Sequence, residues 1–434
     1  MQSVKGMRDF YPKDYRIREW LFQIFKDAST KSGFEFYDAP VVEHEELYIR
    51  KAGEEITEQL YTFEDKSERK IALRPEMTPS LARMVLAQYR QLPGRLKWAA
   101  IAQCFRYERM TRGRKREHYQ WNLDVLGDDS QFAELELLTT AIHALESMGL
   151  NSHEVKLRIS NRNLLADVLS GLGVDPADHL KIFLQIDKLG KVEDSVLIAA
   201  MVKDGTSQAM ATRILEVVKL KSLDEVSELV ASLNAPTRGL GQVQELFSLL
   251  HHYGFSDWLV FDFSIVRGLA YYTGTVFEFF DASRGLRAIA GGGRYDHLIQ
   301  NLADTELSDK AKGSIAMPAV GFGFGDVVIL ELLSDLGKLP EIKPHLDFYL
   351  APFGSAERLS LLPLLRRLRQ KGFDVEMHPG DAKPRKLLEA ALQRGALHCI
   401  MMGSEEREKA EIRIKTFATR EEQVVSLADF LNSL

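Results

Sequence analysis

The chain has 434 residues, of which 45% are hydrophobic and 27% charged, and its formal net charge is −6. This length exceeds one ordinary core, so we expect a soluble globular protein of two or three domains. No apolar run approaches the ~20 residues of a membrane span, and the N-terminal stretch lacks the apolar core of a signal peptide. The acidic balance excludes a wholesale polycation, although a local basic surface could still bind phosphates.

Two cysteines, Cys104 and Cys399, lie far apart in apolar surroundings. They indicate buried thiols in a reducing compartment rather than a disulfide or zinc framework. We therefore expect a cytoplasmic protein with no membrane partner.

In chain order, the apolar spacing predicts a helix over 14–32 and one strand over 34–44. Polar turns then predict two hairpins, over 58–78 and 96–127, with a helix between them. From 130 to about 255 the periodicity is mostly helical, with an insertion at 163–255. Strands resume from 258, and 319–333 is typical of a strand turning into a helix.

After a Pro-containing linker, the pattern alternates strands with helices over about 90 residues, which predicts a separate α/β domain. The chain is expected to end in a strand, EIRIKTF, and a helix over 422–434. The earlier mixture of hairpins and helices predicts an α+β fold with an antiparallel sheet.

The second hairpin carries the strongly charged segment FRYERMTRGRKREH. Arg106 and Glu108 are two residues apart, so on a strand they would share one face, as Gln120, Asn122 and Asp124 would on the return strand. Such a face is either open to solvent or the floor of a polar pocket. Spacing alone leaves both alternatives open.

Five strings occur in order: KGMRDFYP, LRPEMTPSLAR, FRYE with its basic loop, RGLAYYTGTVFE and GGGRYD. Together they resemble histidyl-tRNA synthetases, a family of class II aminoacyl-tRNA synthetases, and the resemblance runs essentially end to end. It implies an α+β fold: an antiparallel sheet flanked by helices, with a helical insertion and a C-terminal α/β anticodon-binding domain.

The resemblance also implies a division of the chain. The catalytic core would occupy 1–162, with motifs 1 and 2, and 256–335, with the histidine motifs and motif 3. The insertion at 163–255 would separate these parts, and the anticodon-binding domain would span 345–434. Because motif 1, GFEFYDAPVVE, supplies the dimer interface in this class, a homodimer is expected.

The implied reaction joins histidine and ATP into histidyl-adenylate with release of pyrophosphate, and then esterifies the 3′ terminal adenosine of histidine tRNA. The attacking carboxylate is already ionised, so the site must supply alignment and compensation of phosphate charge. Mg²⁺ bridging the phosphates is expected, without a dedicated set of protein ligands.

Residue by residue, Arg106 matches the arginine that holds the α-phosphate, and Glu108 the acid that reads the adenine amino group. Arg114 matches a γ-phosphate contact, and Arg267 the histidine-specific arginine on the other side of the α-phosphate. Arg116 is a weaker candidate for contact with the tRNA acceptor end.

For the amino acid, Glu76, Thr78 and Gln120 match residues that bind the α-ammonium group. Asp124 and Tyr272 match positions that hydrogen-bond the imidazole nitrogens, and the adjacent Tyr271 is placed in the same histidine pocket. The glycines of AGGGRYD either allow close approach to a ligand or form a tight turn.

Three positions depart from the family pattern. Asp124 is shorter than the usual glutamate, Ala270 replaces an aspartate, and Val328 occupies the register of the motif 3 arginine, which in the family stacks on adenine and contacts the γ-phosphate. These departures indicate a divergent branch. Ala270 and the missing motif 3 arginine also favour the main alternative, a histidine-sensing regulatory subunit of ATP phosphoribosyltransferase. That protein typically lacks the phosphate-binding arginines and the anticodon-binding domain found here. A synthetase-like RNA-binding protein without chemistry is a third hypothesis.

Overall fold

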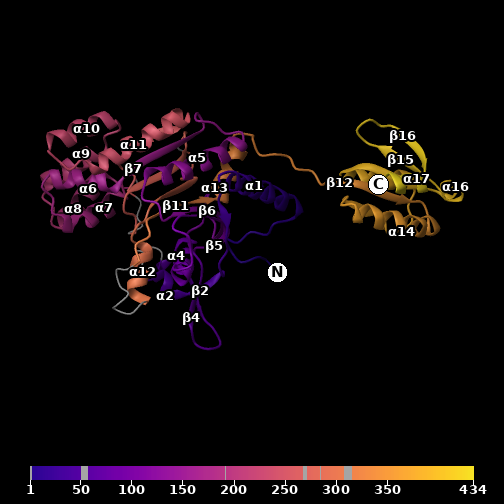
Figure 1. The fold of residues 1–434 in the computed structure, drawn as a ribbon, viewed down its shortest axis with the longest axis horizontal. Coiled ribbons are helices and arrows are strands. Elements are labelled where there is room, and N and C mark those ends of the chain that lie inside the picture. The colour runs from indigo at the N-terminus through magenta and orange to yellow at the C-terminus, as the bar shows by residue number, and fades with distance from the viewer. Residues whose placement is uncertain (1, 50–56, 191, 267–270, 284, 307–314) are drawn as a thin grey trace. The chain divides into compact units, whose positions relative to one another are not determined.

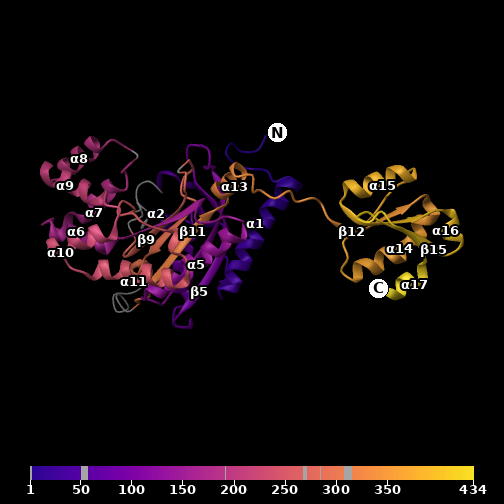
Figure 2. The ribbon, with the colours of Figure 1, turned by 90° about the horizontal axis from the view of Figure 1, so that it is seen from above.

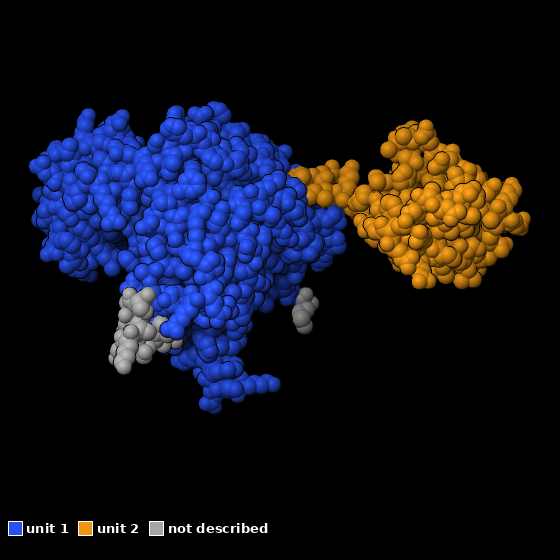
Figure 3. Space-filling model, in the orientation of Figure 1, with its two compact units in different colours: residues 1–339 blue, residues 340–434 orange. Residues whose placement is uncertain are grey.

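The computed structural model describes residues 2–49, 57–190, 192–266, 271–283, 285–306 and 315–434. These form two compact units, Met1–Leu339 and Pro340–Leu434, each with its own hydrophobic core (Figure 3). None of the helices within the described ranges is long and apolar enough to cross a membrane.

An eight-stranded sheet forms the centre of the first unit, in the order β1-β5-β6-β11-β10-β9-β7-β8 (Figure 1). The outer pairs β1–β5 and β7–β8 are parallel, and every other neighbouring pair is antiparallel. The strands are β1 (Glu35–Phe36), β5 (Leu96–Phe105), β6 (Glu117–Leu126), β7 (Val155–Asn161), β8 (Leu259–Phe261), β9 (Thr275–Asp281), β10 (Ala290–Arg294) and β11 (Ala319–Gly325). The predicted α+β class is confirmed.

One face of this sheet is apolar and is covered by helices. These are α1 (Pro12–Lys31), α5 (Gln131–Ser147), α11 (Arg238–Tyr253) and α13 (Asp326–Asp335). Trp121, Phe277 and Phe324 are fully buried in the core between the strands and these helices. Since side chains alternate along a strand, this packing turns the neighbouring residues of β6 toward the opposite face.

On that opposite face, α4 (Thr78–Gln88) and α12 (Leu298–Glu306) share a second core cluster with residues of β6 and β9. A small sheet, ordered β2-β4-β3, adjoins them. Its strands are β2 (Val42–His44), β3 (Tyr61–Glu64) and β4 (Lys70–Leu73), and α2 (Glu45–Ile49) follows β2. The predicted hairpin over 58–78 is confirmed, because β3 and β4 pair in antiparallel fashion.

The helices between β7 and β8 lie together at one end of the large sheet (Figure 2). They build a core of their own, and α11 contributes to this core and to that of the sheet. They are α6 (Arg162–Gly171), α7 (His179–Ile186), α8 (Asp194–Lys203), α9 (Gln208–Val218), α10 (Leu223–Ser232) and α11. Short 3₁₀ turns occur at Pro176–Asp178 and Ser256–Trp258.

Two predicted elements were wrong, and one strand was missed in a stretch that is otherwise mostly helical, as predicted. The single strand over 34–44 is two strands in different sheets, β1 and β2, because Pro40 offers no amide donor between them. Helical periodicity from 130 to 255 is interrupted by β7, whose buried Val155, Leu157 and Ile159 alternate with less buried residues. The start of the predicted last helix is instead β16 (Glu422–Ser426), since its β-branched residues pair with a neighbouring strand.

The second unit is a five-stranded sheet in the order β13-β12-β14-β15-β16. Its strands are β12 (Leu346–Pro352), β13 (Val375–Met377), β14 (Ala396–Met402), β15 (Glu411–Thr416) and β16. The first three are mutually parallel, joined through α14 (Ser355–Gln370) and α15 (Pro384–Gln393), and β15 and β16 are antiparallel. Short helices α16 (Ser404–Glu408) and α17 (Leu427–Ser433) complete it.

A buried ion pair joins the centre of the large sheet to α5. Arg294, at the end of β10, binds Glu134 through two contacts of 2.7 and 2.6 Å, and also donates to the carbonyls of Asp128 and Ser130. The two side chains are 4% and 0% exposed. Removing one partner of such a pair leaves the other charge buried and uncompensated.

We therefore predict that Arg294→Met lowers the free energy of unfolding by about 3–5 kcal/mol. Urea denaturation followed by tryptophan fluorescence measures the change, because all four tryptophans lie in the first unit. Arg213→Met is the matched control, because Arg213 pairs with Glu216 on an exposed helix face, and its effect should stay within about 0.5 kcal/mol. A loss below about 1 kcal/mol for Arg294→Met would contradict the prediction.

Candidate active site

The polar row of β6 lies on the face of the sheet opposite Trp121. Gln120 and Asp124 lean over the neighbouring strand β11, where the closest residues are glycines. A Cβ built on Gly321 would lie 1.9 Å from Asp124 Oδ1, and one on Gly323 would lie 1.7 Å from Gln120 Nε2. The alternating glycines of GFGFG therefore leave the space that these two side chains occupy.

Asp124 is 2% exposed, and its Oδ1 accepts a hydrogen bond of 2.5 Å from the hydroxyl of Tyr295. Burial raises the pKa of Asp124 to about 7, against the lowering effect of this bond. Its Oδ2 and the hydroxyl of Tyr37 are buried without a hydrogen-bond partner in the described part of the chain. A buried polar atom of this kind costs free energy unless a ligand satisfies it.

Two further predicted residues lie beside this carboxyl. The hydroxyl of Tyr271 donates to Glu76 Oε2 at 3.4 Å, and the rings of Tyr271 and Tyr295 are 6.0 Å apart. Glu76 is 6% exposed, and Thr78 begins α4 two residues later. A small, partly enclosed pocket opens here between Glu76, Tyr271 and the apolar side chains of α4 and α12.

Tyr272 is also buried, at 8% exposure, and packs in the core cluster on this side of the sheet. Its carbonyl accepts a hydrogen bond of 2.8 Å from Arg162, which also donates to the carbonyl of Val266 at 3.1 Å. Arg162 thus fixes the chain on both sides of RGLA. Arg267 and Ala270 themselves lie outside the described residues.

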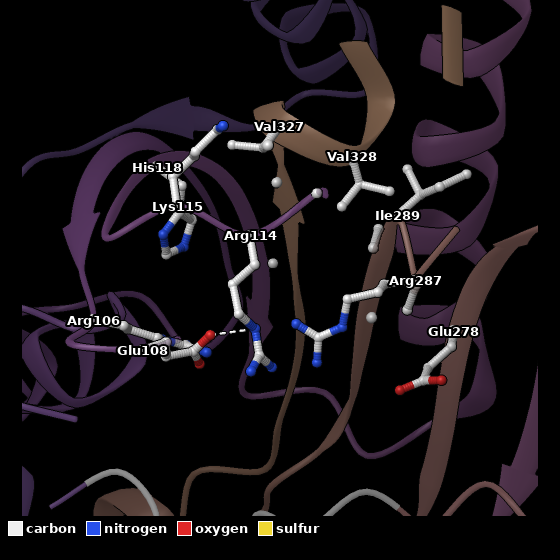
Figure 4. Close-up of a pocket in the computed structure, with 16 residues that line it drawn as sticks. Arg106, Glu108, Arg114, Lys115, His118, Glu278, Arg287, Ile289, Val327 and Val328 are labelled. Carbon is white, nitrogen blue, oxygen red and sulfur yellow. Dashed lines mark ion pairs between the residues drawn. The ribbon is translucent and has the colours of Figure 1, made fainter. Parts of the chain in front are cut away.

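A second cavity, of about 270 Å³, opens at the charged hairpin (Figure 4). Residues of four segments surround it: the hairpin 106–118, strand β9, the stretch 287–291 that leads into β10, and the junction of β11 with α13. Its ionisable lining residues are Arg106, Glu108, Arg114, Lys115, His118, Glu278 and Arg287. Cations outnumber carboxylates, so the cavity suits a polyanion.

The expectation that Arg106 and Glu108 share a strand face was wrong. Strand β5 ends at Phe105, and the amide of Glu108 bonds back to the carbonyl of Arg106 at 2.8 Å in a tight turn. Arg106 Nε donates to the carbonyl of Pro75 at 3.0 Å. Both side chains nevertheless line the cavity, where the carboxylate of Glu108 forms an ion pair with Arg114.

The tip of the hairpin rests on α13. Gly113 has a φ of 75°, a left-handed conformation that glycine adopts readily, and a Cβ there would be 3.4 Å from Val328 Cγ2. Arg112 pairs with Glu331 at 3.2 Å and with Asp335, so this cation binds the helix rather than the cavity. The α13 contacts therefore position the cations that follow in the loop.

Arg116 lies over the ring of Tyr107, with its guanidinium carbon 3.8 Å from the ring centroid. Its Nε contacts the carbonyl of Glu108 at 3.4 Å. His118 lines the cavity, and burial together with Arg106 lowers its pKa to about 3, so its imidazole is neutral at pH 7. Burial likewise raises the pKa of both cysteine thiols to about 12, and both are free.

Sequence reasoning missed four residues that shape these sites: Arg162, Arg287, Tyr295 and Glu134. Tyr295 and Arg287 flank the glycine run of β10, which was the available signal, but nothing in the sequence shows which way they point. The glycines themselves lie within a strand rather than a turn. A Cβ on Gly292 would be 2.0 Å from the carbonyl oxygen of Gly321, so β10 and β11 pack where no side chain fits.

The fold is shared with solved aminoacyl-tRNA synthetases. A histidyl-tRNA synthetase from Nostoc sp. PCC 7120 superposes with a TM-score of 0.78 at 22% identity, covering 100% of this chain and 98% of that one. An ATP phosphoribosyltransferase regulatory subunit/histidyl-tRNA synthetase from Bacillus halodurans C gives a TM-score of 0.71 at 22% identity, covering 93% and 99%.

Sequence comparison identifies the family within the aminoacyl-tRNA synthetases. The histidyl-tRNA synthetase family model matches residues 6–324, and the anticodon binding domain model matches 349–434. The chloroplastic/mitochondrial histidine–tRNA ligase of Arabidopsis thaliana is 40% identical over 98% of this chain and 85% of its own length. The histidine–tRNA ligase of Opitutus terrae is 37% identical over 97% and 95%. The chain belongs to the histidyl-tRNA synthetase family.

The raised pKa of Asp124 predicts a pH dependence of stability. The folded chain holds this proton with a pKa of about 7, against about 3.9 when unfolded, so the contribution is complete below pH 4 and is lost as the pH rises through 7. Between pH 5 and 7.5, the unfolding free energy of the ligand-free protein should fall by about 2 kcal/mol more than that of Asp124→Asn. Urea titrations of both proteins at the two pH values measure this difference, and parallel behaviour would refute it.

Proposed function

We propose that the chain is a histidine–tRNA ligase that activates histidine with ATP and then esterifies the 3′ terminal adenosine of histidine tRNA. Family membership over both units is the observation that carries this proposal. The cation-lined cavity supports it, because a triphosphate needs compensation of its negative charge. The buried Asp124 supports it too, since a histidine ring offers the N–H donor that its second oxygen lacks.

In this proposal Arg106 holds the α-phosphate and Arg267 approaches it from the other side. Glu108 reads the adenine amino group and Arg114 contacts the γ-phosphate. Because Glu108 and Arg114 form an ion pair in the ligand-free chain, nucleotide binding would exchange that pair for contacts with adenine and phosphate.

For histidine, Glu76, Thr78 and Gln120 would bind the α-ammonium group, and Asp124 and Tyr272 the imidazole. Tyr271 would act through its hydrogen bond with Glu76. Tyr295 fixes the orientation of Asp124, which makes it a positioning residue. A site that pairs both ring nitrogens discriminates against side chains that leave these buried groups unsatisfied.

The remaining features follow from the same proposal. Glu278, one of the two carboxylates that line the cavity, could contribute to holding Mg²⁺, which would supply further compensation of the phosphate charge. Arg116 would contact the tRNA acceptor end.

The proposal also includes a homodimer formed through motif 1 and a cytoplasmic location. It divides the chain into two parts of a catalytic core, an insertion and an anticodon-binding domain, at 1–162 and 256–335, 163–255, and 345–434.

A histidine-sensing regulatory subunit of ATP phosphoribosyltransferase remains the competing function, and the Bacillus halodurans C protein described as such a regulatory subunit or as a histidyl-tRNA synthetase shares the fold. Two observations favour the ligase. Arg106 and Arg114 both line the cavity, and the second unit matches the anticodon binding domain model.

We predict ATP–pyrophosphate exchange with histidine and with none of the other amino acids, in the absence of tRNA. Arg267→Ala should reduce the rate by about 10²–10³-fold, the usual effect of losing one group that stabilises charge in a transition state. Arg109→Ala is the control, since Arg109 is exposed in the same hairpin and lies outside the cavity lining. Histidine binding without exchange would instead identify the regulatory subunit.

A further inference from the structure

The junction of β11 and α13 presents an apolar surface to the nucleotide cavity. Val327 and Val328 line it, at 7% and 8% exposure, and Val328 also packs in the large core cluster. The hairpin tip rests on Val328 through Gly113. In this chain the motif 3 position therefore serves packing, and a cation for the phosphates must come from another element.

Arg287 lines the same cavity from the connection between β9 and β10. Figure 4 shows its side chain extending toward Arg114, which reaches in from the hairpin on the other side. The two guanidiniums thus come from residues that are 173 positions apart in sequence (287 − 114 = 173). They converge beside Val328 and Ile289.

The backbone around Arg287 is fixed on both sides. Before it, Asp281 Oδ2 accepts hydrogen bonds from the amides of Gly285 at 3.0 Å and Leu286 at 3.3 Å. After it, the amide of Ile289 donates a hydrogen bond of 2.8 Å to the carbonyl of Phe279. The carbonyl of Ile289 accepts one of 3.2 Å from the amide of Gly325. The loop that carries Arg287 is therefore held by hydrogen bonds on both sides.

Arg114 already pairs with Glu108, and a phosphate placed between Arg114 and Arg287 would add a counter-charge that both guanidiniums can bind. A planar guanidinium also offers paired donors that match phosphate oxygens, which a lysine lacks. The chain as a whole is acidic, with a net charge of −6, so four cations around one cavity are a local arrangement and not a consequence of overall composition.

We propose that Arg287, together with Arg114, grips the β- and γ-phosphates of ATP and the pyrophosphate released from them, and so supplies the charge that Val328 does not. This inference rests on the proposed function. Arg287 would stabilise the leaving pyrophosphate as its charge develops, which requires no proton transfer from the protein.

The test compares the KM values for ATP and for pyrophosphate, because pyrophosphate carries the phosphates without the adenine ring. In ATP–pyrophosphate exchange, Arg287→Ala should raise KM for ATP about 10- to 100-fold, the range for loss of a hydrogen bond to a charged group. KM for pyrophosphate, measured by pyrophosphorolysis of histidyl-adenylate, should rise by a similar factor. Arg287→Lys should bring both KM values part of the way back to those of the wild type. KM for histidine should stay unchanged in both variants.

Arg213→Ala serves as the matched control, because Arg213 is an exposed arginine on α9. Unchanged KM values for ATP and pyrophosphate in Arg287→Ala would overturn the proposal. A raised KM for ATP with an unchanged KM for pyrophosphate would also overturn it, because Arg287 would then contact the nucleoside.

If the wild-type chain shows no exchange with any amino acid, the proposed function fails by itself. The inference about Arg287 is then decided by calorimetric titration of the wild type and Arg287→Ala with ATP and with inorganic pyrophosphate. Weaker binding of both to the variant supports it, and equal binding overturns it.

Discussion

The buried ion pair between Arg294 and Glu134 joins the central strands to the helical layer, and both candidate ligand sites depend on it. Removing two charges from water costs several kcal/mol per ion, which bidentate geometry and two additional carbonyl acceptors offset here. Because Arg294 ends β10, its position fixes the residues on either side. Tyr295 follows immediately and reaches Asp124, and Arg287 precedes the strand and lines the cation-lined cavity.

Strand β6 serves two environments because its side chains alternate. Trp121, Leu123 and Val125 are buried in the large core, whereas Gln120 and Asp124 lie over the glycines of β11. The same register that completes the core therefore orients the polar groups. Burial raises the pKa of Asp124 to about 7, and one of its carboxyl oxygens has no hydrogen-bond partner among the described residues. A buried carboxyl with a perturbed pKa and an unpaired oxygen marks a candidate functional site.

Several elements together position the charged side chains of the cation-lined cavity. The hairpin contributes Arg106 and Arg114, but α13 holds the hairpin in place through Arg112 and Gly113. Arg8, near the N-terminus, further links the start of β6 to the start of α13 by binding Glu117 at 2.6 Å and Asp326 at 2.9 Å. A change in any of these contacts would alter the spacing of the cations without removing one.

The sequence by itself determined the α+β class, the hairpins, the separate C-terminal unit and the family, since periodicity, turn residues and ordered motifs are local properties of the chain. It also gave candidate residues by type, but not their mutual placement. Strand β7 within a helical stretch was missed because it pairs with β9, more than 100 residues further along the chain. The end of β5 at Phe105 and strand β16 were missed because a local turn and pairing with the preceding strand decide them. Only the tertiary structure brought Tyr295 to Asp124 and Arg287 opposite Arg114. Tyr295 and Asp124 are 171 residues apart in sequence, and Arg287 and Arg114 come from separate segments that line one cavity. Both placements depend on strand order, which no local pattern encodes.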